Sequence, residues 1–470
     1  MYPEFSVRVG QALGNERLRR NIRRTMDGLI EKRRQAFPDP QELTVLRRLG
    51  KLIRGQALAN LPDLLLELET NCERNGIRVH WAETAAEANA IVLDLLRRHG
   101  AEMVIKGKSM VSEEMGLNHY LEAQGIQAVE TDLGEFILQL AGERPSHIIA
   151  PAIHKDRREI AALFAAHYPE HPYTEDIEGL TAIARRIMRE HFGQAVAGLS
   201  GVNFAIAETG TLCLVENEGN GRLCTTAPDI HIAVCGIEKV IARLDQLPPL
   251  LTLLTRSATG QPITTYVNLI SGPRREGELD GPREVHLVLL DNGRSRIHQD
   301  SQLKATLRCI RCGACMNHCP VYTRLSGHAY GTVYPGPIGS ILEPQLQGLD
   351  HLGELADASS LCGACGEACP VRIPVPGLLR RLRAEGVMGL GKSRVLGRGS
   401  RRKPLHRLLW TLWRQANASP ALYRLMTVLA TRLRRLIPTR LGPWSRTRVA
   451  PEIASRSLHE LARADGFSRD

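Results

Sequence analysis

The sequence predicts an α/β domain with a mostly parallel sheet, then a mainly α-helical domain rich in cysteine, with helical segments at both ends of the chain. Three observations lead to this prediction. Apolar runs alternate with amphipathic runs in residues 65–295. Two cysteine-rich runs lie within residues 296–385, and apolar residues recur at helical spacing in residues 1–64 and 386–470. We therefore expect four parts with these boundaries.

The first part, residues 1–64, has a helical pattern. Leu18, Ile22, Met26 and Leu29 recur every three or four residues, with arginines between them. The stretch PDPQEL then interrupts this pattern and is expected to begin the next helix.

Residues 65–295 are expected to alternate between strands and helices, which indicates a largely parallel sheet. Residues 201–217 indicate two strands that meet near Thr209 and Gly210. The other expected strands are short apolar stretches, most of them followed by a helical pattern, at 76–82, 101–107, 126–132, 146–152 and 231–241.

The composition, 43% hydrophobic and 24% charged, is typical of a globular protein. No stretch approaches the roughly 20 apolar residues that span a bilayer, and the first residues lack the apolar core of a secretory signal. We therefore expect a cytoplasmic protein, in which closely spaced cysteines hold metals more often than they form disulfides. Four of the 11 cysteines lie outside the two runs and are expected to be buried in the core: Cys72, Cys213, Cys224 and Cys235.

The first cysteine run has the spacing C-x2-C-x2-C-x3-C-P, with Cys309, Cys312, Cys315 and Cys319 followed by Pro320. Zinc sites usually pair two separate C-x-x-C motifs, whereas this compact spacing is typical of bacterial ferredoxins. In ferredoxins, three of these thiolates bind one cluster and the fourth cysteine binds the other cluster. The run therefore predicts two iron–sulfur clusters of the [4Fe-4S] type with crossed ligands.

The second run repeats this spacing, but Ser359 stands at its first position. A serine oxygen is a poor ligand for iron in a sulfide cluster. Three forms of the second cluster therefore stay open: [3Fe-4S], [4Fe-4S] with a ligand other than cysteine, or a cluster with an exchangeable iron. Crossed ligation divides the seven cysteines into Cys309, Cys312, Cys315 and Cys369 for cluster one, and Cys319, Cys362 and Cys365 for cluster two.

Polar residues at the expected strand ends are candidate sites, because ligands of open α/β sheets usually bind there. Lys106 and Lys108 precede a helix start that suits an anion. The stretch VETDLGE is acidic, and AETGT forms a tight turn. The catalytic candidates in these stretches are Lys106, Asp132 and Glu208. Polar residues also occur at strand ends without any function, so the catalytic residue stays unknown.

Several longer motifs resemble the lactate utilisation protein B family. They are KSMVSEEMGLN, VETDLGEFILQL, PSHIIAPAIHK, GVNFAIAETGTLCLVENEGNGRL and GIEKV in the α/β part, and GHAYGTVYPGPIG between the cysteine runs. The resemblance covers nearly the whole chain. It implies that residues 65–295 form a lactate-utilisation (LUD) domain, similar to the NagB/RpiA/CoA-transferase-like fold. The second run of that family also tends to carry three cysteines, with which Ser359 agrees.

The resemblance further implies an iron–sulfur electron-transfer subunit of a cytoplasmic complex that oxidises L-lactate to pyruvate. The implied partners are two other lactate-utilisation subunits, a cysteine-rich-domain protein and a second LUD-domain protein. No dinucleotide fingerprint stands out in a strand–turn–helix setting, so neither NAD nor flavin is expected on this chain. The alternative is a catalytically active α/β domain of the CoA-transferase or isomerase kind with regulatory clusters, in which Glu208 is the candidate nucleophile by analogy of fold.

The last part, residues 386–470, carries a net charge of +14, whereas the preceding residues carry −3 of the total of +11. It contains two amphipathic patterns, over 405–413 and 422–433, in which leucines share one face with Trp413 or Met426. A basic tail of this kind suits an acidic partner or a membrane surface better than nucleic acid, and no nucleic-acid partner is expected.

Overall fold

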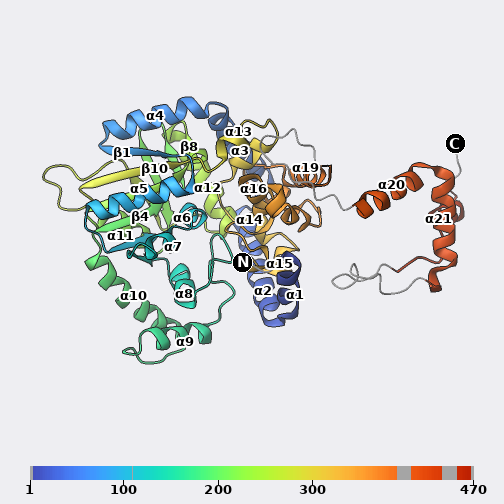
Figure 1. Cartoon of the computed structure of the whole chain (residues 1–470), viewed down its shortest axis with the longest axis horizontal. Coiled ribbons are helices and arrows are strands. Elements are labelled where there is room, and N and C mark those ends of the chain that lie inside the picture. Colours follow the sequence, from blue (N-terminus) through green and yellow to red (C-terminus); the bar gives the residue numbers. More distant parts are fainter. Residues whose placement is uncertain (1–3, 108, 389–403, 437–451, 467–470) are drawn as a thin grey trace. The chain divides into compact units, whose positions relative to one another are not determined.

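The chain forms two compact units, seen in Figure 1. The described residues of the larger unit lie within 4–386, and those of the smaller unit within 387–388, 404–436 and 452–466. Within the described residues, no helix is long and apolar enough to cross a membrane. The computed structural model describes residues 4–107, 109–388, 404–436 and 452–466.

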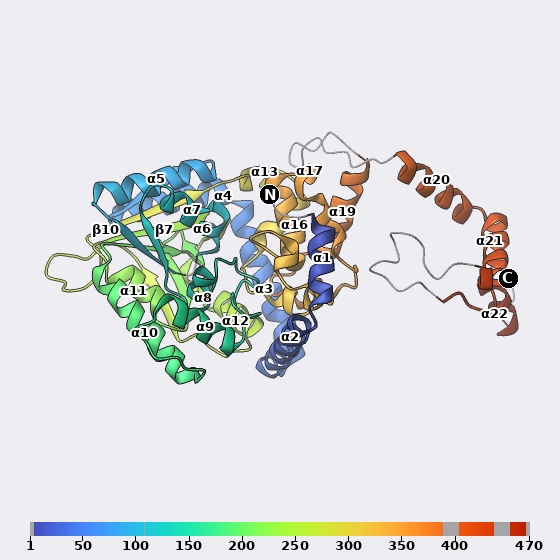
Figure 2. The same ribbon diagram turned by 60° about the horizontal axis from the view of Figure 1, so that its bottom comes forward.

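The larger unit begins with four helices, and two of them meet at PDPQEL, where the sequence predicts one helix to end and the next to begin. Asn15 caps the second of them through the N–H of Leu18 at 3.0 Å, and Pro40 opens the third. The buried Ile22 and Met26 of the second helix pack against the cysteine-rich part, where both views place the first two helices (Figure 2). The four helices are α1 (Phe5–Gly14), α2 (Glu16–Ala36), α3 (Pro40–Ala59) and α4 (Leu61–Arg74).

A six-stranded sheet forms the centre of the α/β domain, and all its strand pairs are parallel. This confirms the predicted fold class. Its spatial order is β1-β10-β7-β4-β2-β3. The strands are β1 (Ile77–Ala82), β2 (Met103–Gly107), β3 (Gln127–Glu130), β4 (Ala197–Gly201), β7 (Ile230–Gly236) and β10 (Glu284–Leu290).

Helices cover both faces of this sheet, which is why its strands are apolar on both sides. In β2, Val104 packs with the helices of one face and the next residue, Ile105, with those of the other. The first face carries α5 (Ala85–Arg98), α6 (Met110–Met115) and α7 (Leu117–Glu122), and the second carries α8 (Leu133–Ala141), α9 (Arg157–His167) and α10 (Ile177–Gln194).

A second sheet has the order β8-β5-β6-β9. Its β5 and β6 form an antiparallel hairpin, which confirms the two strands predicted to meet near Gly210. The four cysteines outside the runs are buried, as expected. The strands of this sheet are β5 (Phe204–Ile206), β6 (Thr211–Glu216), β8 (Val240–Ile241) and β9 (Tyr266–Ile270). The remaining helices of this part of the chain are α11 (Asn220–Thr226), η1 (Ile237–Lys239), η2 (Leu244–Gln246), α12 (Leu247–Ala258) and α13 (Arg294–His298).

The prediction of a strand at residues 146–152 is wrong, because this stretch consists of turns and bends. Its apolar residues pack against the cysteine-rich part instead of extending the sheet. Tyr322 Oη donates to the carbonyl of Ser146 at 2.6 Å, and His147 Nε2 lies 3.0 Å from Asn317 Oδ1. The stretch therefore connects the α/β domain to the cysteine-rich part.

The cysteine-rich part is built from short helices, as predicted. Its core is continuous with that of the α/β domain, since Cys312 and Cys369 belong to the same cluster of buried residues as Leu287 of β10. Its elements are η3 (Leu303–Arg308), α14 (Ala314–Asn317), α15 (Tyr322–Leu325), η4 (His328–Tyr330), α16 (Gly336–Gln347), α17 (Leu349–Leu352), η5 (Gly353–Asp357), α18 (Ala364–Ala368) and α19 (Val375–Met388).

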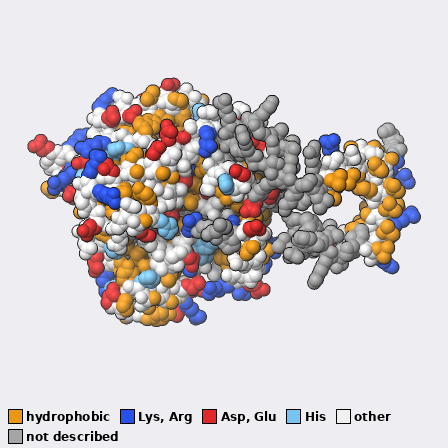
Figure 3. All heavy atoms as spheres, in the orientation of Figure 1, with side chains coloured by type: hydrophobic (Ala, Val, Ile, Leu, Met, Phe, Trp, Pro, Cys, Tyr) orange, Lys and Arg blue, Asp and Glu red, His pale blue; other side chains and the backbone are white. Residues whose placement is uncertain are grey.

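The smaller unit contains both amphipathic helices predicted from the sequence, α20 (Pro404–Ala418) and α21 (Pro420–Arg432), followed by η6 (Arg434–Leu436) and α22 (Leu458–Ala464). Large apolar side chains, among them Trp410 and Trp413, are exposed on these helices, and Figure 3 shows hydrophobic atoms along both α20 and α21. The acidic partner or membrane surface expected for this unit stays a prediction.

Candidate iron–sulfur centre

The first cysteine run forms a tight turn that follows η3 and continues into α14. The backbone N–H of Arg311 donates to Cys309 Sγ at 3.4 Å. Arg311 and Gly313 have φ angles of 60° and 73°, the left-handed conformation in which the chain reverses sharply. These turns bring Cys309, Cys312 and Cys315 to a single small cavity.

A cysteine of the second run completes the lining of this cavity. Cys369 lies there with the three cysteines of the first run, and the N–H of Ile373 donates to its Sγ at 3.3 Å. Most of the other lining side chains are apolar: Ile148, Ile310, Ile338, Pro370, Val371, Ile373 and Val375. The fold thus brings together the four cysteines that crossed ligation assigns to cluster one.

The other three cysteines form a second group, which reaches the surface. Cys319 is buried and accepts from the N–H of Tyr322 at 3.4 Å, whereas Cys362 is exposed. Burial, and then the neighbouring Cys319, raise the pKa of Cys365 to about 11, and Cys362 acts in the same direction. The three thiols thus lie close enough to affect one another electrostatically, as the grouping assigned to cluster two requires.

Ser359 occupies the same place in the second run as Cys309 does in the first. Its Oγ accepts from the N–H of Leu361 at 3.1 Å, which matches the contact between Arg311 and Cys309. Leu361 and Gly363 have φ angles of 56° and 91°, so the backbone repeats the turn of the first run. The fourth position of the second group therefore carries a hydroxyl on a cysteine-type turn.

The donor set of both groups fits iron–sulfur clusters. Burial raises the pKa of Cys312 and Cys315, so their thiols are neutral without metal and must lose protons to bind it. Soft sulfur donors in a compact x2-x2-x3 spacing suit iron–sulfur clusters, whereas structural zinc sites use four ligands in two separate pairs. Backbone N–H groups of Arg311, Tyr322 and Ile373 donate to cysteine sulfurs, and hydrogen bonds of this kind tune iron–sulfur clusters.

Lys106, a candidate in the α/β domain, lies at the end of β2 and is fully enclosed. Its Nζ is 2.6 Å from Glu130 and 2.7 Å from Glu113. Burial alone would lower the pKa of Lys106, but these two carboxylates outweigh it and raise that pKa. Lys106 thus forms ion pairs inside the domain, and the structure gives it no open anion site. Ser109 caps α6, and Lys108 lies outside the described residues.

Asp132, the second candidate, caps α8 and lines a cavity of about 190 Å³. Met110, Asp132 and Asn203 place this cavity after β2, β3 and β4, three neighbouring strands. The chain passes from β2 outward to β3 and then back across to β4, which makes this edge a switch point of the sheet, the usual ligand site of such folds. Ile148 and Arg311 line both this cavity and that of the first cysteine group, so the two are neighbours.

Glu208, the third candidate, lies apart from Asp132 and Lys106. It is exposed at the turn between β5 and β6, and its Oε2 accepts from the N–H of Leu244 at 2.9 Å. It does not line the cavity at the strand ends. The geometry therefore does not favour Glu208 as the nucleophile of a CoA transferase.

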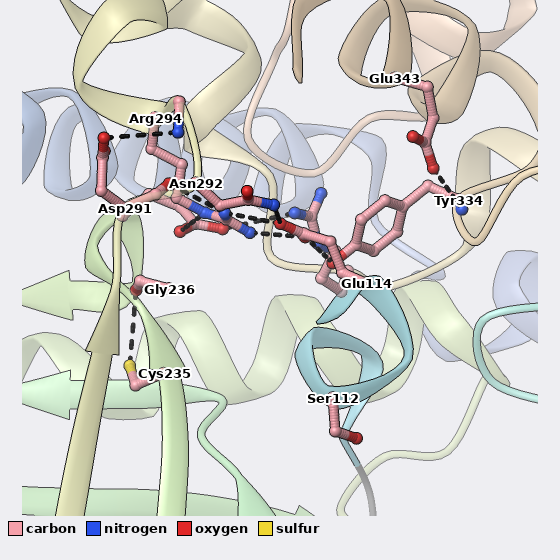
Figure 4. A network of polar contacts seen from close by, with 12 residues as sticks. Ser112, Glu114, Cys235, Gly236, Asp291, Asn292, Arg294, Tyr334 and Glu343 are labelled. Atoms are coloured by element: carbon pink, nitrogen blue, oxygen red, sulfur yellow. Dashed lines mark hydrogen bonds and ion pairs between the residues drawn. The ribbon is translucent and has the colours of Figure 1, made fainter. Parts of the chain in front are cut away.

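A buried ionic network beside the first cysteine group escaped sequence reasoning. Both terminal nitrogens of Arg294 lie 2.8 Å from Glu114, which also accepts from Tyr334 Oη at 2.8 Å (Figure 4). Arg294 and Arg311 share Glu238, at 2.6 and 3.3 Å. Burial opposes the charge of Glu238, but these arginines lower its pKa to about 2.

The network links the α/β domain to the cysteine-rich part through charge. Three of its residues stand in motifs that the sequence displays, since Glu114 lies in KSMVSEEMGLN, Glu238 in GIEKV and Tyr334 in GHAYGTVYPGPIG. Those motifs were the signal in the sequence that could have pointed to the network. Only the fold shows that they meet, because they lie about a hundred residues apart in the chain.

Comparison with known families divides the chain into three matched segments. Residues 65–290 match the LUD domain, residues 305–373 match a 4Fe-4S dicluster domain, and residues 381–466 match the C-terminal region of lactate utilisation protein B.

Curated relatives match over most of their length. Lactate utilization protein B of Bacillus subtilis is 43% identical over 83% of this chain and 81% of that protein. The protein of the same name from Bacillus velezensis is 42% identical over 90% of this chain and 86% of its own length. An uncharacterized electron transport protein of Escherichia coli, YkgF, is 42% identical over 84% of this chain and 83% of its own length.

Proposed function

The chain belongs to the lactate utilization protein B family, and we propose from this that it is the iron–sulfur electron-transfer subunit of a complex that oxidises L-lactate to pyruvate. The cavity lined by cysteines of both runs carries the proposal. When bound, two clusters supply one-electron transfer through the chain. The proposed partners are two further lactate-utilisation subunits, a cysteine-rich-domain protein and a second LUD-domain protein.

The seven cysteines of the two runs are the proposed ligands. By the spacing of the run, Ser359 takes the remaining position of the second group, and its Oγ accepts from the N–H of Leu361. That cluster is therefore [3Fe-4S], [4Fe-4S] with a ligand other than cysteine, or a cluster with an exchangeable iron. The proposed sets are Cys309, Cys312, Cys315 and Cys369 for the first cluster, and Cys319, Cys362 and Cys365 for the second.

Lactate is proposed to bind on a partner subunit. Three acidic residues, Asp132, Glu135 and Glu216, are among those that line the cavity at the strand ends, and an acidic lining disfavours a carboxylate anion. Arg311 is the one cation among the described lining residues, and it already forms an ion pair with Glu238. The role proposed for this chain is therefore to receive electrons from lactate oxidation and pass them on.

Oxygen-free purification tests this proposal through iron and sulfide counts, EPR spectra, and lactate-dependent reduction of a dye with the partner subunits present. We expect about seven or eight irons per chain. Cys312→Ser should remove the signal of one cluster and leave the other weakened but visible.

Cys213→Ala is the matched control, because Cys213 is a buried cysteine of β6 outside both groups. It should keep both signals. A colourless protein, or one that contains zinc and no iron, contradicts the proposal.

A further inference from the structure

The N-terminal helices direct arginines at the loop that carries Cys369. Arg47 of α3 donates through Nε to the carbonyl of Cys369 at 3.0 Å and through Nη2 to that of Gly366 at 3.1 Å. Arg33 of α2 donates through Nη2 to the carbonyl of Ala368 at 3.2 Å. Two guanidinium groups thus contact the backbone beside one cluster ligand, more than 300 residues away along the chain.

A third arginine of these helices holds the segment that leads into Cys309. Arg54 of α3 is 1% exposed and donates to the carbonyls of Leu307 at 3.1 Å and Arg308 at 3.4 Å. It also donates to the carbonyl of Val240 at 2.8 Å in the α/β domain. Arg54 therefore fixes the start of the first run against the sheet.

Further cations surround the first cysteine group. Arg308 is buried and near enough to Cys369 to feel its charge, and Arg311 stacks on Tyr334 with its guanidinium 4.3 Å from the ring centre. Lys239 is buried near Cys309, and burial lowers the pKa of Lys239 to about 8. Glu238 partly balances this charge, but it is shared between Arg311 and Arg294. The first group thus lies in an excess of buried positive charge.

The second group has a different electrostatic environment. Arg383 donates through Nη2 to the carbonyl of Ser359 at 2.7 Å, but its Nε lies 3.5 Å from Asp357, which offsets the charge. Cys362 is open to solvent, which screens nearby charges further. Arginines of α2 and Arg324 also line the surface beside Cys319, so the two groups differ mainly in how far solvent screens the cations around them.

We propose that Arg33, Arg47 and Arg54 are positioning residues that raise the reduction potential of the cluster held by Cys309, Cys312, Cys315 and Cys369 above the potential it would have without them. This inference rests on the proposed iron–sulfur function. Positive charge near a thiolate-bound cluster stabilises its reduced, more negative form, and the effect is strong where solvent is excluded. A secondary alcohol is a weak reductant, so a raised potential suits a subunit that receives electrons from its oxidation.

Redox titration of the purified holoprotein, followed by EPR, tests the proposal. Arg47→Gln and Arg33→Gln each remove one charge and keep an amide donor. We expect each to shift the midpoint potential of the first cluster downward, with a larger shift in the double variant. The potential of the second cluster should shift less, although Arg47 also contacts the carbonyl of Gly366 beside Cys365. The Cys312→Ser protein, which lacks the first cluster, assigns the signals.

Arg48→Gln is the matched control, because Arg48 neighbours Arg47 on α3 but is exposed. It should leave both potentials unchanged. Arg47→Lys keeps the charge while losing the two-carbonyl contact, so it should restore most of the potential lost in Arg47→Gln. Arg383→Gln provides the reciprocal comparison and should act on the second cluster alone.

Separate outcomes overturn the inference and the function beneath it. If the variants keep both clusters and both potentials, the arginines are only structural and the inference fails. It fails also if Arg47→Lys lowers the potential as much as Arg47→Gln does, because charge would then be irrelevant. If the unmodified protein lacks iron and sulfide, the proposed function itself is wrong.

Discussion

The two cysteine groups share a local backbone but differ in their surroundings. In each run, the residue two positions after the start has a φ near 60°, 60° at Arg311 and 56° at Leu361, and a left-handed glycine follows. The first group is enclosed by the sheet and the N-terminal helices, whereas the second reaches solvent at Cys362.

The repeated cysteine motif therefore determines the local turn, whereas the rest of the fold determines the environment of each cluster. Solvent exposure, net charge and hydrogen bonds to sulfur all set the reduction potential of an iron–sulfur cluster. Two clusters on one repeated motif therefore need not have the same properties.

Replacing single cysteines of the second run is the most severe test of the crossed grouping. Cys369→Ser changes the last cysteine of the second run, yet we expect it to abolish the first cluster, because Cys369 lines that cavity. Cys362→Ser, seven residues earlier, should abolish the second cluster instead. EPR spectra and iron counts of the two variants, compared with those of Cys312→Ser, test which cluster each cysteine binds.

If the grouping is crossed, the EPR spectra and iron count of Cys369→Ser should resemble those of Cys312→Ser, and those of Cys362→Ser should not. If both variants of the second run lose the same cluster, each run binds its own cluster and the crossed assignment is wrong.

Restoring the absent cysteine is expected to have a smaller effect, confined to the second group. Ser359→Cys places a thiol on a turn that already has the geometry of Cys309. If the second cluster is [3Fe-4S], the iron count should rise by about one and the EPR signal of its oxidised form should disappear. The first cluster should be unchanged.

Ser359→Ala is the control, since it removes the hydroxyl without adding a ligand. Loss of the second cluster in Ser359→Ala would identify the serine oxygen as its fourth ligand. An unchanged cluster in both variants would show that position 359 takes no part in binding.

Much of the fold was predictable because its signals are local. Strands such as β2 and β7 are short apolar runs followed by turns. The cysteine spacing likewise predicts the grouping without any knowledge of the fold. The helical pattern of α2 follows equally from the spacing of Ile22 and Met26, which the structure buries.

The failures concern contacts between distant segments. Residues 146–152 have the apolar composition of a strand, but they pack against Tyr322 and Asn317 of the cysteine-rich part. Arg33 and Arg47 look like ordinary surface arginines of amphipathic helices, since nothing local distinguishes them from Arg34 or Arg48. Their role depends on a loop more than 300 residues later, which no pattern within a helix indicates.

The smallest expected difference between the two groups concerns their equivalent glycines. A side chain at Gly313 or Gly363 is strained by the left-handed backbone, by about 1–2 kcal/mol. At Gly313 a Cβ would also lie 3.2 Å from His147 and 3.4 Å from Ile149, whereas at Gly363 it meets nothing within 4 Å. Gly313→Ala should therefore destabilise the protein more than Gly363→Ala, by roughly a further 1–3 kcal/mol if the stretch cannot adjust.

The temperature at which half of the visible cluster absorption is lost, at one fixed heating rate, measures this difference. Gly377→Ala, in the helix α19 with open space around the added atom, is the control and should not lower that temperature. Equal losses in Gly313→Ala and Gly363→Ala would mean that the contact between the first run and residues 146–152 yields easily. The first group would then owe its enclosure to the N-terminal helices and the sheet rather than to that stretch.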